Sequence, residues 1–148
     1  ELLVTLMVIG LISTIVLTNS NFLTKYQTDQ THSYHLFIEY LSEESALTKK
    51  NVAWFIGNDA QHVASFANNA WQLQTLKSDV LPDIKLSTRF KDNRGYVFSL
   101  SDNRKDPFVV FYPSGQSSGG EIVFDDAANN FTLKIDKYSS VEILKKKL

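Results

Sequence analysis

The residues of this 148-residue chain that could do chemistry begin with a serine between glycines. Residues 115–119 read Gly-Gln-Ser-Ser-Gly and fit the G-x-S-x-G pattern of a hydrolase, with Ser117 as the nucleophile. That chemistry needs a strand before the serine, a helix after it and a histidine later in the chain. The residues after Ser117 instead resemble another strand, and no histidine follows His62. The sequence therefore favours a hairpin loop here, and we predict no catalysis.

Two further groups of side chains could bind a metal ion. His32, His35 and Glu39 are spaced to share one helix face, and imidazole with carboxylate is a zinc-binding combination. A second, acidic group consists of Asp125, Asp126 and Asp136. It lacks the Asp-x-Asp-x-Asp spacing of a calcium loop. We expect surface or packed histidines and turn-forming aspartates, and therefore neither a metal nor another cofactor.

A carboxylate leads a long apolar segment at the start of the sequence. Glu1 is followed by apolar or small uncharged residues as far as Leu17, and the next charge is Lys25. An acid inside a membrane helix costs roughly 2.5–3.5 kcal/mol, and a paired buried charge costs far less than an isolated one. Glu1 is therefore predicted to direct assembly with other chains. The alternative is an interfacial residue stabilised by the helix dipole.

The apolar segment itself is predicted to be a retained membrane anchor. Its start is acidic and no Ala-x-Ala cleavage site occurs near residues 18–25, which disfavours a secretory signal peptide. Seventeen helical residues rise about 25 Å, slightly less than a hydrocarbon core of about 30 Å. The anchoring and helix-packing residues are predicted to be Leu2, Leu3, Val4, Leu6, Val8, Ile9, Gly10, Leu11, Ile12, Ile15, Val16 and Leu17.

One long helix is predicted to carry these residues. No proline precedes Pro82, so the helix is expected to run from residue 1 to about residue 49, with a possible kink at 18–21. Its first part, 1–21, is apolar all round, and its second part, 22–49, is amphipathic. The apolar stripe of the second part is predicted to contain Phe22, Tyr26, Leu36, Phe37, Tyr40, Leu41 and Leu47.

The remaining residues, 50–148, are predicted to form an antiparallel β-domain. Their apolar pattern changes to a period of two, with turn-forming residues between the segments. The expected strands are 52–56, 70–76, 95–100, 107–112, 121–125, 131–135 and 141–144. The amphipathic half of the helix can cover the hydrophobic face of such a domain. The fold class is therefore α+β, with a long N-terminal helix packed on two small sheets.

Composition sets limits on the possible partners. The net charge is −1, so no global basic field favours nucleic acid, and the chain has no cysteine for a disulfide or a thiolate metal site. The basic run Lys145-Lys146-Lys147 could touch phosphates, although a solvated terminus explains it more simply.

The N-terminal segment and several segments of the β-domain together resemble a known family. The stretch from Glu1 to Ile12 is similar to the mature N-terminus of type IV pilins and pseudopilins from its glutamate onward. The Trp71 strand, the Leu81-Pro82 turn and the segment 107–116 follow in an order that resembles the H-type minor pseudopilins of type II secretion systems and related minor pilins.

This resemblance implies a role in a periplasmic filament. Residues 1–21 would span the bacterial inner membrane, among its lipids, and later pack in the filament core. Residues 50–148 would lie in the periplasm, and prepilin peptidase would cleave before Glu1. The implied partners are other minor pseudopilins of the tip complex, the major pseudopilin and, for Glu1, the N-terminal amine of an adjacent subunit. A loop for partner contact is predicted at Ser114, Gly115, Gln116, Ser117 and Ser118. The alternative is a minor pilin of a type IV pilus, with assembly, adhesion or DNA uptake as its output.

Overall fold

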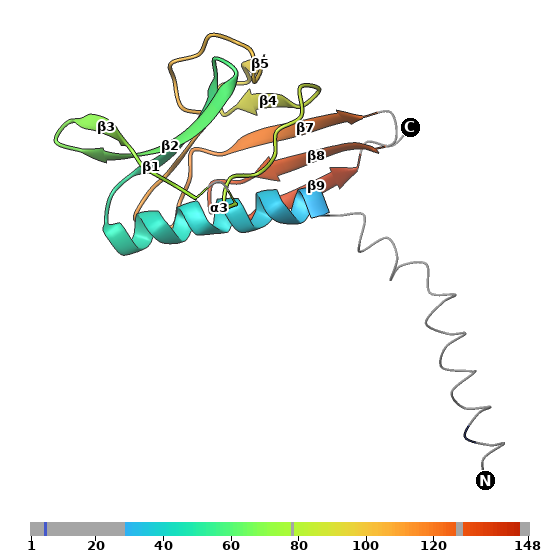
Figure 1. The fold of residues 1–148 in the computed structure, drawn as a ribbon. Helices are drawn as coiled ribbons and strands as arrows, with labels where there is room; N and C mark the ends of the chain where they lie inside the picture. The colour runs from blue at the N-terminus through green and yellow to red at the C-terminus, as the bar shows by residue number, and fades with distance from the viewer. Residues whose placement is uncertain (1–4, 6–28, 78, 127–128, 146–148) are drawn as a thin grey trace. The chain divides into compact units, whose positions relative to one another are not determined.

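The computed structural model describes residues 5, 29–77, 79–126 and 129–145, which Figure 1 shows as a coloured ribbon. Contacts divide the chain into the units Glu1–His32 and Ser33–Leu148, and the second unit contains both sheets and most of the described helix. Apart from the helical Thr5, the elements are α3 (Asp29–Thr48), β1 (Val52–Gly57), β2 (Ala60–Ala67), β3 (Ala70–Leu73), β4 (Arg89–Asp92), β5 (Val97–Ser99), β6 (Val109–Phe111), β7 (Gly120–Asp126), β8 (Asn129–Ile135) and β9 (Val141–Lys145).

The strands form two antiparallel sheets. Sheet A has the order β3-β2-β1-β6, and sheet B has the order β5-β4-β7-β8-β9. The chain crosses from sheet A to sheet B after β3, returns to sheet A at β6 and crosses again before β7. Residues 33–48 of α3 run along one side of the two sheets (Figure 1). The prediction of an α+β fold with two small antiparallel sheets is confirmed for the described residues.

Aromatic side chains fill the core between the sheets and the helix. The fully buried Trp54 of β1 lies at its centre, with ring-centroid distances of 5.0 Å to Phe37 and 5.5 Å to Phe108 in edge-to-face geometry. Its indole N–H donates to the side-chain oxygen of Gln61, whose amide donates to the carbonyl of Pro82. The N–H of the buried indole therefore has a hydrogen-bond acceptor. Gln61 also ties the 74–88 crossover to sheet A.

The helix buries part of the predicted stripe: Phe37 and Leu41 are buried and Tyr40 packs against the core, as predicted, whereas Phe22 and Tyr26 lie outside the described residues. Its core residues are Tyr34, Phe37, Ile38 and Leu41, at spacings of three and four. Leu36 and Leu47, which the prediction placed on the covering face, are 50% and 79% exposed, so that part of the prediction was wrong. The spacing argument failed because these two leucines share the opposite side of the helix, 11 residues and about three turns apart.

The C-terminal end of α3 is fixed to sheet A. The hydroxyl of the buried Ser45 donates to the carbonyls of Lys50 and Phe111, at 2.7 and 3.0 Å. Lys49 follows the helix with a φ of 58°, the left-handed conformation that commonly ends a helix. The helix predicted for residues 1–49 is confirmed from 29 to 48, and the possible kink at 18–21 lies outside the described residues.

Two tight turns build sheet A from consecutive strands. Asn58 and Asp59 join β1 to β2, Asn68 and Asn69 join β2 to β3, and all of them have φ between 53° and 59°. Two successive left-handed residues make a type I′ turn, which matches the twist of a hairpin. The predicted strands are confirmed in outline, but the prediction missed β2 and β4.

Candidate functional site

The predicted assembly residue and the predicted anchor lie outside the described residues. The assembly residue is Glu1, and the anchor consists of the apolar residues between Leu2 and Leu17. Within 1–17 the structure describes only Thr5, which is not one of the predicted anchor residues. No helix within the described residues is long and apolar enough to cross a bilayer. The roles assigned to Glu1 and to the apolar segment therefore stay predictions.

The glycine- and serine-rich segment is a crossover with a small hairpin at its tip. The N–H of Tyr112 donates to the carbonyl of Gln116 at 2.8 Å, and Phe111 faces Ser117 in an antiparallel bridge. The local hairpin agrees with the prediction. However, β6 and β7 on either side belong to different sheets, so the segment connects sheets A and B rather than two paired strands.

Ser117 and Ser118 hold this crossover in place. The Ser117 hydroxyl is buried and donates to the carbonyl of Asp136 at 2.7 Å, and the Ser118 hydroxyl accepts from the N–H of Val110 at 3.0 Å. The serine is therefore bonded to a backbone carbonyl and is followed by a strand, which does not build a nucleophile elbow. Of the predicted partner-contact residues, Ser114 and Gln116 are exposed and Ser117 is buried, and their role in partner contact stays a prediction.

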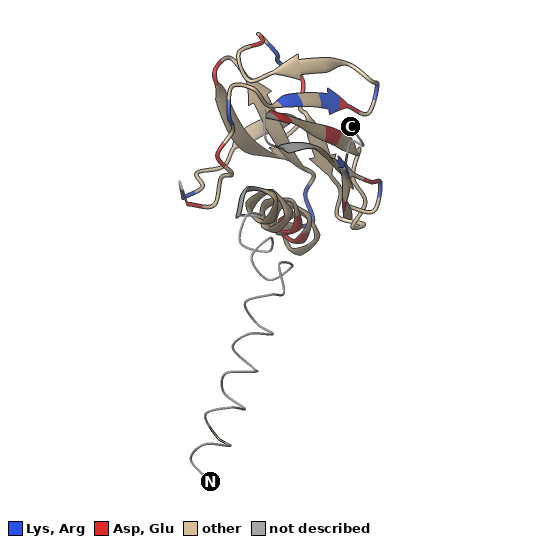
Figure 2. Ribbon diagram, turned by 90° about the vertical axis from the view of Figure 1, so that its right-hand side faces the viewer, with Lys and Arg blue, Asp and Glu red and all other residues tan. Residues whose placement is uncertain are grey.

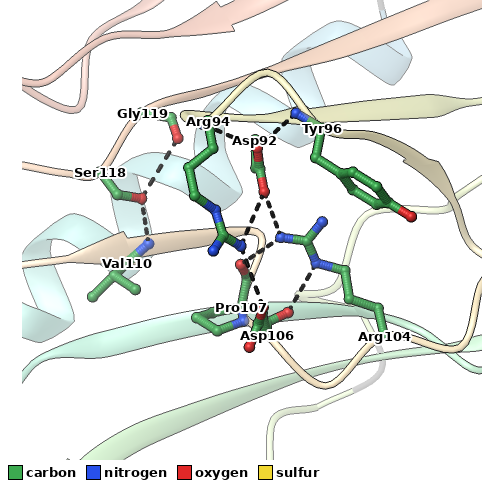
Figure 3. A network of polar contacts seen from close by, with 9 residues as sticks. All are labelled: Asp92, Arg94, Tyr96, Arg104, Asp106, Pro107, Val110, Ser118 and Gly119. Atoms are coloured by element: carbon green, nitrogen blue, oxygen red, sulfur yellow. Dashed lines mark hydrogen bonds and ion pairs between the residues drawn. The ribbon is translucent and has the colours of Figure 1, made fainter.

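A buried ion pair joins the end of β4 to the 100–107 loop (Figure 3). The Asp92 carboxylate accepts from the Arg104 guanidinium at 2.8 Å, and their side chains are 2% and 8% exposed. Backbone N–H groups of Arg94 and Tyr96 also donate to Asp92, at 3.0 and 2.9 Å. Burial alone would raise the pKa of Asp92, but these hydrogen bonds and the Arg104 charge hold the pKa below its usual value.

The same loop makes further contacts within itself and with both sheets. The Arg104 guanidinium lies over the ring of Phe98, 4.0 Å from its centroid, and donates to the carbonyls of Asp106 and Pro107. At the loop's other side, the N–H of Asn58 donates to the carbonyl of Asp102 at 2.9 Å. The loop therefore ties the β1–β2 turn of sheet A to the β4–β5 turn of sheet B. Sequence reasoning missed this network, because Asp92 and Arg104 are separated by 12 residues without a spacing signal.

The outer face of sheet A, turned away from the core, is an aromatic surface. Phe55 stacks on the imidazole of His62 at 4.9 Å and meets Trp71 edge-on at 5.6 Å. Phe66 also meets Trp71 edge-on, at 5.2 Å, and the neighbouring Leu73 is 72% exposed. We define the outer patch as the residues on this face, namely Ala53, Phe55, His62, Ala64, Phe66, Trp71, Leu73 and Val110. Burial lowers the pKa of His62, which favours the neutral imidazole, so this patch has no formal charge near pH 7.

The outer face of sheet B has the opposite character. Lys91, Glu121, Lys134 and Glu142 lie side by side on four successive strands. The Lys91 ammonium and the Glu121 carboxylate are 3.3 Å apart. Such alternation of charge across strands is typical of a solvated face. Figure 2 shows basic positions in blue and acidic positions in red along the ribbon, including on strands.

His35 and Glu39 line a hollow of about 270 Å³ between α3 and the β8–β9 turn, but His32 is not among its lining residues. No three His, Cys, Asp or Glu side chains of the described residues are placed to hold a metal ion.

Of the aspartates predicted to form turns, Asp125 and Asp126 lie in strand β7, so the prediction was wrong for them, and only Asp136 lies at a turn. Asp136 accepts from the N–H groups of Tyr138 and Ser140, at 2.8 and 2.9 Å, so the prediction of a turn is confirmed there.

Comparison with known proteins gives a match by structure and none by sequence. No protein-family model and no curated protein matches the chain. The solution structure of GspH from E. coli matches with a TM-score of 0.60 and 15% identity, covering 86% of this chain and 94% of GspH. The minor pseudopilin EpsH of the Vibrio cholerae type 2 secretion system matches in one structure with a TM-score of 0.56 and 15% identity, covering 77% of this chain and 92% of EpsH. A crystal structure of EpsH gives 0.55 and 14%, covering 79% of this chain and 92% of EpsH. The chain therefore has the fold of the minor pseudopilin EpsH and of GspH.

Proposed function

We propose that this chain is an H-type minor pseudopilin, a structural and non-catalytic subunit of a type II secretion system. It joins the tip complex of the periplasmic pseudopilus to the shaft and so supports export of folded proteins across the outer membrane. The observation that carries the proposal is the match of its fold to minor pseudopilins over more than three quarters of the chain.

The sequence supplies the second line of support. The Glu1-led apolar segment has the composition of a pseudopilin anchor, and its apolar residues hold such a helix in a bilayer by several kcal/mol. Glu1 opposes insertion, so a filament that pairs the carboxylate offers the segment a better environment than lipid does. In this proposal the chain waits in the inner membrane with residues 50–148 in the periplasm. It is processed by prepilin peptidase, and it then assembles with other minor pseudopilins and the major pseudopilin.

A complementation experiment tests this function. In the bacterium that produces the protein, deletion of its gene is expected to abolish accumulation of a secreted enzyme in the medium while the enzyme persists in the periplasm. The wild-type chain restores secretion, and Glu1→Leu does not, because the carboxylate that favours assembly is lost. Glu39→Leu, which removes an exposed glutamate from α3, is the matched control and restores secretion.

The same strain separates secretion from the pilus alternative. Normal secretion in the deletion strain, combined with lost surface pili or lost DNA uptake, contradicts the proposal. That result assigns the chain to the minor pilins instead.

A further inference from the structure

The two sheets present edge strands of very different character. Sheet A ends at β3 and β6, and sheet B ends at β5 and β9. Edge strands with free backbone groups invite pairing with another strand, and proteins usually cover or charge them. Whether the backbone groups of each edge strand are covered or charged therefore indicates where the strand of another chain can pair.

Three of these edges are protected, each in its own way. At β6 the N–H and carbonyl of Val110 are both bonded to Ser118, at 3.0 and 2.8 Å. At β5 the Asp102 carboxylate accepts from the N–H of Ser99 at 2.7 Å, so the loop closes over the strand end. At β9 the exposed Glu142 places a charge on the edge strand. These devices disfavour pairing with a further strand.

The β3 edge has no such protection in the described structure. Ala70–Leu73 contains neither charge nor proline, and all four residues are exposed. The Asn68-Asn69 turn and the bond from the N–H of Gln74 to the carbonyl of Val63 fix which residues bond to β2. Alternation along an antiparallel pair then turns the N–H and carbonyl groups of Trp71 and Leu73 away from β2. The described residues supply no partner to these outward groups.

The same two residues also contribute their side chains to the outer patch. Trp71 and Leu73 lie on the aromatic face, where the register places them opposite Phe66 and Ala64. A strand added at this edge would therefore gain backbone hydrogen bonds and an apolar surface together. A charged strand would lose hydration there without meeting a counter-charge.

We propose that this edge pairs antiparallel with the β3 edge of a second copy of the chain. A two-fold axis at Gln72 places Trp71 of one copy opposite Leu73 of the other, so that each outward N–H faces an outward carbonyl. The interface is then isologous, and the uncharged segment meets its copy without like-charge repulsion. The two outer patches join into one continuous apolar face. This inference does not rest on the proposed secretion role.

A single cysteine at the axis tests the proposal, because the chain contains no native cysteine. In the proposed pair the two Gln72 residues form a non-hydrogen-bonded pair with Cα atoms about 4.5 Å apart, within the range that a disulfide spans. Full-length Gln72→Cys in detergent is therefore expected to give a covalent dimer on mild oxidation. Gln116→Cys, exposed at the tip of the crossover, is the matched control for dimers held by other segments.

A second substitution separates edge pairing from chance collision. Leu73→Lys in the Gln72→Cys background puts a charge opposite Trp71 of the second copy, and it is expected to reduce the dimer at least tenfold. Leu73→Val is expected to keep the dimer, and both variants should melt at the wild-type temperature, because Leu73 is 72% exposed. Equal cross-linking at residues 72 and 116, or no effect of Leu73→Lys, overturns the proposal. A cross-link from residue 72 to a different pseudopilin, in place of a second copy, also overturns it.

Discussion

The ion pair between Asp92 and Arg104 ties the end of β4 in sheet B to the 100–107 loop, and this loop also bonds to the β1–β2 turn of sheet A. Their carboxylate and guanidinium are 2.8 Å apart and almost fully buried. Breaking such a pair leaves an uncompensated buried charge, which costs about 3 kcal/mol or more. The pair therefore matters less for its own attraction than for what its loss would leave behind.

Asp92→Asn is accordingly expected to lower the free energy of unfolding by about 3 kcal/mol at pH 7. The native pKa of Asp92 is depressed, so its carboxylate stabilises the fold fully above the unfolded pKa of about 3.9. That contribution is lost as the pH falls through the native pKa. The difference between wild type and Asp92→Asn should thus be constant above about pH 5 and shrink in stronger acid. Urea unfolding of the full chain, followed by tryptophan fluorescence at several pH values, measures it.

Asp106→Asn is the control for this experiment. Its carboxylate meets Arg94 at 3.2 Å, but both side chains are 67% exposed, and exposed ion pairs contribute about 0–1 kcal/mol. A loss at Asp106 as large as that at Asp92 would contradict the importance of burial.

At the scale of elements, the 100–107 loop packs against a glycine at the end of β1. Gly57 has a φ of 150°, and a Cβ placed there would lie 2.8 Å from the backbone carbonyl oxygen of Asp102. Gly57→Ala is expected to destabilise the fold by about 2 kcal/mol or more, because backbone must move on both sides. Gly95→Ala is the matched control: its φ is 85°, no atom beyond its two chain neighbours lies within 4 Å of the new Cβ, and the cost is backbone strain of about 1 kcal/mol. Equal losses in thermal unfolding would contradict the close contact.

The elements that the sequence predicted correctly are those with a strong local signal. The strand around Leu133 alternates clearly between apolar and polar residues, and the strand around Trp54 is a continuous apolar run. Strand β2 was missed because its centre mixes His62 and Ser65 with small residues. The Asn58-Asp59 and Asn68-Asn69 turns on either side could have located it.

Other features depend on contacts that no local pattern encodes. Lys91 and Asp92 have the composition of a turn, and Asp92 can end a buried strand because Arg104 neutralises it from a distant loop. Ser117, which the sequence predicted to lie in a hairpin loop, also depends on a distant contact. A carbonyl 19 residues later accepts its hydrogen bond and keeps it buried. Of the candidate site, the sequence indicated the Glu1 segment and the crossover tip, but not the unprotected β3 edge.

At the scale of the whole molecule, the second unit presents two unlike outer faces. Sheet B carries alternating charges and suits solvent, whereas sheet A carries the uncharged, aromatic outer patch. The proposed pseudopilin thus has separate regions for separate tasks. Its N-terminal segment would pack in the filament, and its β-domain would meet neighbours through one face while the other stays in water.

The measurement that tests the central claim most directly is co-isolation of the chain with its sibling pseudopilins from detergent-solubilised membranes. The account predicts that the wild-type chain and Glu39→Leu recover the siblings equally. Glu1→Leu should remain in the membrane fraction but recover at least tenfold less of them, since a carboxylate that loses more than about 1.4 kcal/mol of pairing changes the equilibrium tenfold. Equal recovery of the siblings by Glu1→Leu and wild type would contradict the proposed assembly role.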